Sequence, residues 1–143
     1  MAHQQVSPAR GAAYVVLLRA ASSKTHTDLS LAAAPELGAL EERDGALALE
    51  LVSGTLRRRN SIDAVLRSCS KPALRSVAPA VLTALRLGAY QLLYLDRVPA
   101  HAAVDQSVAL VARRGRGTRG YVNAVLRAVA ATGRTLLEAA GAG

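Results

Sequence analysis

The chain of 143 residues contains no phenylalanine, no tryptophan and a single cysteine, Cys69. A lone cysteine excludes a disulfide within the chain and is compatible with a reducing compartment. The three histidines, His3, His26 and His101, are scattered at spacings that match no metal site. A domain of this length can bury roughly 68–70% of its unfolded surface, so it can fold without a disulfide or a metal.

Long apolar runs are also missing from the sequence. No stretch approaches the ~20 apolar residues that a membrane-spanning helix needs. The first ten residues, MAHQQVSPAR, are polar and unlike a secretory signal peptide, and the apolar stretch that follows is interrupted by Arg19. We therefore expect a cytoplasmic protein without a membrane segment.

Strand-type alternation never lasts more than a few residues, whereas apolar residues recur at helical spacing through most of the chain. The sequence predicts an all-α domain of about seven helices packed as helical bundles. We expect the helices at residues 8–22, 28–33, 41–59, 62–69, 79–95, 100–114 and 122–131. Residues 1–7 are expected to be disordered, and residues 132–143 to form a loosely ordered tail.

Several positions carry more specific structural predictions. Pro35 and Gly38 are expected to end the second helix, and Gly54 indicates close contact between two helices. The fifth helix has few polar residues, so it should be central, with Tyr90 and Tyr94 in the core. The buried stripe of the third helix is expected at Ala48, Leu49, Val52 and Leu56.

Positive charge is in excess and unevenly distributed. Eighteen Lys and Arg against ten Asp and Glu give a formal charge of +8. Residues 1–71 hold nine basic and seven acidic residues (+2), and residues 72–143 hold nine basic and three acidic residues (+6). A surface with this excess of positive charge favours binding of polyanions, RNA before DNA. The alternative is a soluble protein that is merely rich in arginine.

The sequence GRGTRG at residues 115–120 fits the G-x-G-x-x-G pattern of dinucleotide-binding loops. Such a loop needs a strand before it and further parallel strands after it, whereas residues 100–114 have a helical period. We therefore interpret the segment as a hinge between two helices. The arginines around it form either a site for an anion such as an RNA phosphate or a solvated basic turn. They are Arg113, Arg114, Arg116 and Arg119.

Other arginines are weaker candidates for RNA contact. Arg57, Arg58 and Arg59 end the third helix, where cations are stabilising in any case. Successive helical residues point about 100° apart, so only one or two of them could face RNA, and we select Arg57 and Arg58. Arg10 on the first helix could extend the basic surface. Because the only aromatic residues are four tyrosines, we expect RNA to be bound through phosphates and shape.

Residues typical of catalysis are absent from the sequence. Asp96 and Asp105 form no recognisable acid–base pair, and no nucleophile elbow is present. We therefore expect no catalytic residue and no cofactor site in this chain.

Three stretches taken together resemble the NusB family of all-α RNA-binding domains. They are RDGALALELVSGTLRRRNSIDAVL (43–66), LRLGAYQLLYLDRVPAHAAVDQSVALVAR (85–113) and GYVNAVLRAVA (120–130). The resemblance covers residues 8–131 and is strongest to the N-terminal domain of RsmB-type rRNA (cytosine-5) methyltransferases. It implies two three-helix bundles built around a shared long helix, and binding of ribosomal RNA.

The same resemblance implies what lies outside this chain. RsmB-type enzymes continue into a Rossmann-like domain that binds S-adenosylmethionine and uses a cysteine nucleophile. The present sequence stops before such a domain, and Cys69 lacks the Pro-Cys or Thr-Cys context of that nucleophile. We therefore expect an RNA-recognition domain whose partners are RNA and a methyltransferase domain. The alternatives are a transcription antitermination factor, whose partner would be a ribosomal-subunit protein, and a protein-interaction domain that has lost RNA binding.

Overall fold

The computed structural model describes residues 5–22 and 35–141, and every regular element in those ranges is helical. The elements are α1 (Pro8–Ser22), α2 (Pro35–Gly38), α3 (Glu42–Arg57), α4 (Arg59–Cys69), the 3-10 helix η2 (Leu74–Ser76), α5 (Pro79–Tyr94), α6 (Ala100–Leu110), the 3-10 helix η3 (Ala112–Arg114) and α7 (Arg116–Ala139). The expected all-α class is confirmed. The helix predicted over residues 28–33 lies outside the described residues. None of the described helices is long and apolar enough to cross a membrane.

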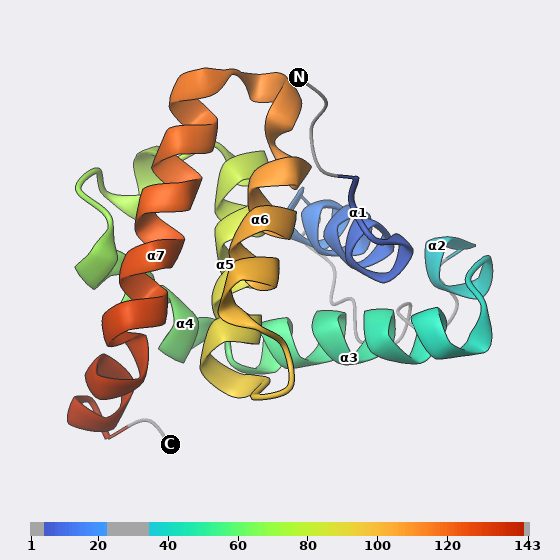
Figure 1. Cartoon of the computed structure of the whole chain (residues 1–143), viewed down its shortest axis with the longest axis horizontal. Helices are drawn as coiled ribbons and strands as arrows, with labels where there is room; N and C mark the ends of the chain where they lie inside the picture. The colour runs from blue at the N-terminus through green and yellow to red at the C-terminus, as the bar shows by residue number, and fades with distance from the viewer. Residues whose placement is uncertain (1–4, 23–34, 142–143) are drawn as a thin grey trace.

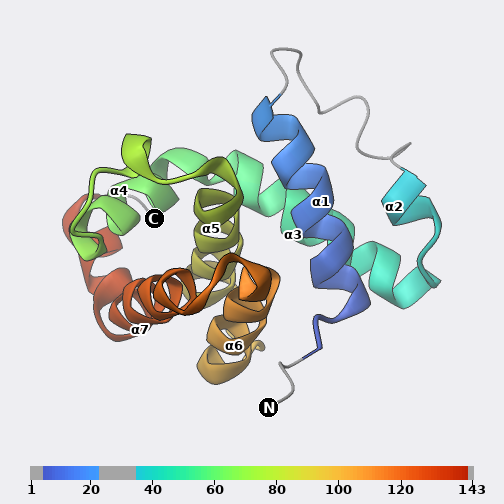
Figure 2. The ribbon, with the colours of Figure 1, turned by 90° about the horizontal axis from the view of Figure 1, so that it is seen from above.

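The helices form two groups that share α5 (Figures 1 and 2). One group consists of α1, α2 and α3, and the other of α4, α6 and α7. Helix α5 packs against α1 and α3 on one side and against α4, α6 and α7 on the other. The predicted arrangement of two bundles around a central helix is therefore confirmed, although the longest helix is α7, with 24 residues.

Helix α5 is central because its sequence is apolar nearly all round. It begins with Pro79 at its first turn, where the missing N–H is not needed. Ten of its 16 residues are buried, so no broad face is left for solvent. The glutamine on this helix, Gln91, is only 1% exposed and uses its amide to donate to the Leu87 carbonyl oxygen at 3.0 Å.

Two glycines allow other helices to approach α5 closely. A Cβ on Gly54 of α3 would lie 2.1 Å from the Tyr90 hydroxyl oxygen, and Tyr90 is only 5% exposed. A Cβ on Gly88 would lie 2.5 Å from the hydroxyl oxygen of Ser107 on α6. The predicted close contact at Gly54 is thus confirmed, as is the place of Tyr90 in the core; Tyr94 is partly buried against the core.

The buried face of α3 differs from the predicted stripe. Ala48 and Val52 are buried as expected, but Leu51 is buried in place of Leu49, which is 41% exposed. The residues that face the core are at positions 48, 51, 52 and 55, which follow the i, i+3, i+4, i+7 pattern. Leu49 is rotated by about 100° from Ala48 around the helix axis, which places it outside that face.

Several predicted helix ends were wrong. Pro35 and Gly38, predicted to break the chain after a helix at residues 28–33, themselves bound the short helix α2, with Pro35 in its first position. Helix α4 begins directly at Arg59, and α6 already ends at Leu110, where Val111 leaves helical geometry (φ −108°, ψ 16°).

Both ends of the described chain are more ordered than expected. Helix α7 continues to Ala139, and Gly133 and Leu137 on it are buried, so residues 132–139 do not form a loose tail. Residues 5–7 are held by Gln106 of α6. The Ser7 N–H donates to the Gln106 side-chain oxygen at 2.7 Å, and the Gln106 amide donates to the Gln5 carbonyl oxygen at 3.0 Å.

Candidate nucleic-acid interface

The turn between α6 and α7 is shorter than the sequence suggested. Gly115 alone connects η3 to α7, with φ 105° and ψ 170°, a backbone conformation available almost only to glycine. Residues 116–120 are already helical, and the Arg119 N–H closes the first turn on the Gly115 carbonyl oxygen at 3.1 Å. The expected six-residue hinge is therefore corrected to one glycine, and the absence of a preceding strand confirms that it is no dinucleotide loop.

The arginines of this turn gather at the N-terminus of the longest helix. Arg113 and Arg114 lie on η3 and Arg116 begins α7, and all three side chains are exposed. Arg119 is partly buried and donates from Nη1 to the Ala112 carbonyl oxygen at 2.8 Å, which fixes η3 against α7. These four arginines are called the arginine turn below.

The electrostatics of the arginine turn are unusual for a helix start. A helix N-terminus carries a partial positive charge, so a cation there costs about 0.3–1 kcal/mol and an anion gains as much. The first turn of α7 nevertheless contains no acidic residue. Exposed guanidinium groups thus adjoin a helix N-terminus, and this combination favours binding of an anion such as phosphate.

A groove between α6 and α7 begins at the arginine turn. It has a volume of about 390 Å³ and is lined by Asp105, Val108, Ala109, Ala112, Arg116, Arg119, Gly120 and Asn123. Asp105 also borders a second hollow of about 430 Å³, where His101 and Arg127 contribute polar groups. We call the two together the α6–α7 groove. Its lining combines small apolar side chains with polar and charged ones.

Arg10 is partly buried and paired within the domain. Its Nε donates to the Gln91 side-chain oxygen at 2.7 Å, and its Nη1 donates to the Ser7 hydroxyl at 3.2 Å. Burial lowers the pKa of this guanidinium. Arg10 therefore joins α1 to α5, and its contribution to RNA contact stays a prediction.

The N-terminal half of α1 nevertheless lies near the arginine turn. The Tyr14 hydroxyl donates to the Ala80 carbonyl oxygen at 2.8 Å, at the start of α5. Burial raises the pKa of the Tyr14 phenol, and the positive charge of Arg114 opposes that shift. Arg114 is thus close enough to act on Tyr14. The starts of α5 and α7 and the end of α6 lie at one end of the molecule (Figure 1).

Arg57 and Arg58 lie at the opposite end of α5. The Arg58 guanidinium lies over the Tyr94 ring, 4.8 Å from its centroid, and Arg57 is exposed. Ala80 and Tyr94 are separated by 14 residues of α5, which is about 21 Å at 1.5 Å per residue. The structure therefore does not bring Arg57 and Arg58 together with the arginine turn.

Asn123 and Arg127, on the α7 side of the α6–α7 groove, were missed by the sequence interpretation, whereas Arg116 and Arg119 were predicted. Arg116, Asn123 and Arg127 follow one another at seven and four residues on α7, a spacing that places them on one side of a helix. The signal was hidden because the seventh helix was expected to begin at residue 122 instead of 116.

Cys69, at the end of α4, is not presented as a reactive thiol. It is partly buried, and that burial raises the pKa of the thiol, with a contact to Thr132 acting in the other direction. Thiolate chemistry needs a lowered pKa, so this environment does not suit a nucleophile. Among the described residues, no three His, Cys, Asp or Glu side chains come close enough to hold a metal ion.

Comparisons with known proteins agree with this architecture. The ribosomal RNA small subunit methyltransferase B of Thermus thermophilus is 43% identical over 89 residues, which cover 62% of this chain and 22% of that protein. The enzyme of the same name from Pseudomonas putida is 33% identical over 129 residues, covering 90% of this chain and 29% of that protein. The present chain thus spans less than a third of the length of these relatives.

A solved structure shows the same fold. NusB from T. maritima superimposes with a TM-score of 0.76 at 20% sequence identity, covering 90% of this chain and 93% of that one. Residues 7–131 match the family described as the NusB family. These matches confirm the resemblance drawn from the sequence, and this chain belongs to the NusB family.

Proposed function

We propose that this NusB domain binds small-subunit ribosomal RNA and positions it for a methyltransferase domain. Relatives that match most of this chain are named as small-subunit rRNA methyltransferases, and the chain corresponds to under a third of their length. The methyl transfer, with its S-adenosylmethionine, is assigned to the remainder of such proteins. The present residues would supply recognition of the RNA.

The arginine turn is the observation that carries this proposal. Arg113, Arg114 and Arg116 are exposed and have no hydrogen-bond or ion-pair partner among the described residues. They surround a helix N-terminus without a nearby acidic residue in its first turn. Guanidinium groups bind phosphate oxygens in a bidentate manner, and the helix start adds backbone donors.

Contacts to the bases are expected to be few. Tyr14 and Tyr121 both use their hydroxyl groups within the domain, bonded to Ala80 and Ser70, and Tyr90 is buried. Tyr14 and Tyr121 are also partly buried, so we expect little stacking of bases near the arginine turn. The RNA should be recognised through its backbone and shape, with Asn123 in the α6–α7 groove able to contact a base edge or a ribose.

The proposal is tested by removing the exposed charge of the arginine turn. Arg113, Arg114 and Arg116 are replaced together by alanine, while Arg119 is kept because it holds η3. Labelled fragments that together cover the small-subunit rRNA are first compared, and the fragment that the unmodified chain binds most tightly is chosen. Its affinity for both proteins is then measured between about 50 and 300 mM salt. The slope of log K against log salt should become shallower by about 0.7–0.9 for each phosphate that the variant no longer neutralises.

A matched control removes the same charge elsewhere on the surface. The triple alanine variant of Arg43, Arg97 and Arg134 changes the net charge equally, but these residues lie away from the arginine turn, the last two in surface ion pairs. Its affinity and salt slope should stay close to those of the unmodified chain. Unmodified protein without any salt-dependent affinity for these fragments would contradict the proposal.

Transcription antitermination is the alternative function, and a relative that is named a transcription antitermination protein supports it. An antitermination factor of this family would be expected to use a basic first helix. The two arginines of α1 are both paired within the domain, Arg10 with Gln91 and Arg19 with Glu36. This pairing favours rRNA recognition through the arginine turn. Pull-down of a ribosomal-subunit protein would instead favour antitermination.

A domain that has kept the fold but lost RNA binding is the remaining alternative. It predicts that the arginine-turn variant and the control variant behave alike with every RNA fragment. In that case the arginine turn would be a solvated basic turn, and a protein partner would have to be sought.

A further inference from the structure

A second basic groove lies between α4, η2 and the first half of α5. It has a volume of about 540 Å³ and is called the α4–α5 groove here. Its lining consists of Asp63, Arg67, Ser70, Lys71, Pro72, Ala73, Leu74, Arg75, Leu82 and Arg86. Four of these side chains are cationic and one is a carboxylate, so the groove is positively charged overall.

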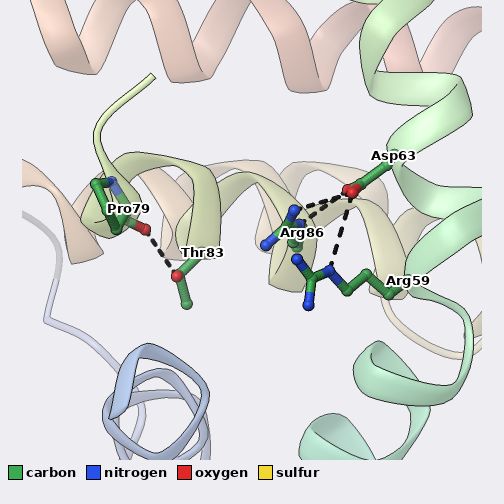
Figure 3. A network of polar contacts seen from close by, with 5 residues as sticks. All are labelled: Arg59, Asp63, Pro79, Thr83 and Arg86. Carbon is green, nitrogen blue, oxygen red and sulfur yellow. Dashed lines mark hydrogen bonds and ion pairs between the residues drawn. The ribbon is translucent and has the colours of Figure 1, made fainter. Parts of the chain in front are cut away.

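The single carboxylate is already neutralised. Asp63 accepts from Arg86 through both oxygens, with Nε to Oδ1 at 2.8 Å and Nη2 to Oδ2 at 2.9 Å (Figure 3). Arg59, one turn earlier on α4, lies 4.0 Å from the same carboxylate. This bidentate pair is largely buried, and both oxygens of the Asp63 carboxylate are engaged in it. The remaining cations of the groove keep their full charge.

Those remaining cations are Arg67, Lys71 and Arg75. All three are exposed, and none has a hydrogen-bond or ion-pair partner among the residues that the structure describes. Three unpaired cations at one groove repel one another and destabilise the fold slightly, so a bound anion would relieve the repulsion.

The segment that carries Lys71 and Arg75 is held firmly in place. Leu74 is buried beneath it, and the Ser70 hydroxyl donates to the Pro72 carbonyl oxygen at 2.8 Å. The same hydroxyl lies 2.7 Å from the Tyr121 hydroxyl of α7. The two cations are therefore presented by a fixed loop, and binding would cost little ordering of the backbone.

Tyr121 also shows how this groove lies relative to the first one. It is two residues from both Arg119 and Asn123, a rotation of about 200° around the helix axis at 3.6 residues per turn. Arg119 and Asn123 line the α6–α7 groove. The N-terminal half of α7 therefore runs between the two grooves. Helices α6 and α4 lie on its two sides (Figure 2).

We propose that the α4–α5 groove binds a second segment of RNA backbone, so that one RNA contacts the domain on both sides of α7. The inference rests on the proposed RNA-binding function. Arg67 and Arg75 would bind phosphate oxygens through their guanidinium groups, and Lys71 would act as a point charge between them. A helix is about 10–12 Å across with its side chains, so an RNA that reaches both grooves must be folded or sharply bent.

The test removes the three unpaired cations by replacing Arg67, Lys71 and Arg75 with alanine. Affinity for a folded small-subunit rRNA hairpin should fall by about tenfold or more, which corresponds to ~1.4 kcal/mol. The salt slope should become shallower by about 0.7–0.9 for each phosphate left without its cation. An unstructured strand of the same composition, too short to reach both grooves, should show a much smaller decrease in affinity.

The control and the contrary outcomes separate this inference from the proposed function. The Arg43, Arg97 and Arg134 triple variant should retain its affinity. If the arginine-turn variant weakens binding while the α4–α5 variant does not, the second groove is refuted and the proposed function stands. If the unmodified chain binds no RNA, both are refuted.

A single substitution guards against misfolding of the triple variant. Lys71→Glu places a negative charge in the groove without touching the Asp63–Arg86 pair. It should weaken hairpin binding more than Lys71→Ala does, at an unchanged thermal unfolding midpoint. Equal hairpin affinities for these two variants would overturn the inference.

Discussion

At the scale of single residues, the arginines of this domain divide into two kinds. Arg10 and Arg86 are partly or largely buried and each is committed to a side chain of another helix. Arg113, Arg114 and Arg116 are exposed without a hydrogen-bond or ion-pair partner among the described residues. Net charge counts both kinds alike, but only the second kind can exchange water and counterions for RNA phosphates.

A glycine at the contact of α3 and α5 gives a stability prediction. Gly54→Ala should destabilise the domain by about 1–3 kcal/mol, because the added methyl group overpacks the buried Tyr90 ring. The gain in helix propensity, up to ~1 kcal/mol, offsets part of this cost. The measurement is the free energy of unfolding in urea, followed by far-UV circular dichroism.

Gly120 provides the matched control for that substitution. A Cβ at this position of α7 would meet nothing within 4 Å. Gly120→Ala should therefore stabilise the domain by roughly 0.5–1 kcal/mol through the lower entropy of the unfolded chain. Equal effects of the two substitutions would mean that the close contact of α3 and α5 is absent.

At the scale of elements, the start of α7 depends on one backbone conformation. Gly115→Ala should cost about 1–3 kcal/mol, because φ 105° with ψ 170° is a region that alanine avoids. The strain should also displace η3 from α7 and lower the affinity for rRNA fragments. Gly117→Ala, in the first turn of α7 with open space around it, is the control: like Gly120→Ala it should not lower the stability, and it should leave the affinity nearly unchanged. Unaltered stability of Gly115→Ala would show that the turn can adopt another conformation.

Helix interiors could be predicted from the sequence better than helix ends. The stripe Val122, Val125, Leu126 and Val129 is buried as its spacing indicated. The ends of α6 and α7 could not be found in the same way, because Gly117 and Gly120 resemble loop residues until the helix around them is known. The last turns of α7 were missed because Gly133 looks like a stop signal, whereas it is small enough to let α7 pack against Leu93.

At the scale of the whole molecule, the sequence predicted the fold and part of the candidate site. The arginine turn was visible because its residues are adjacent in sequence. The separation of Arg57 from that turn, and the second groove formed by Arg67, Lys71 and Arg75, depend on how α4 and α5 pack. Residues far apart in the sequence are brought together by tertiary contacts, and these contacts cannot be predicted from a local sequence pattern.

The central position of α5 predicts that the two groups of helices unfold together. Gln91 links them, because it lies on α5, is almost completely buried and accepts from Arg10 on α1. Gln91→Met should destabilise the domain by about 1–3 kcal/mol, since it leaves the Nε of the half-buried Arg10 guanidinium without its acceptor. Replacing Arg10 by methionine as well should recover part of that stability, because both polar groups are then gone.

Hydrogen exchange distinguishes cooperative from independent unfolding in the Gln91→Met variant. If α5 couples the two groups, amides of α1 and α3 and amides of α6 and α7 should lose protection by the same factor. The physical reason is that α5 buries residues against both groups, so neither can release it without exposing the other's core. Loss of protection confined to α1 and α3 would show instead that α4–α7 form a stable core on their own, with the N-terminal group docked onto it.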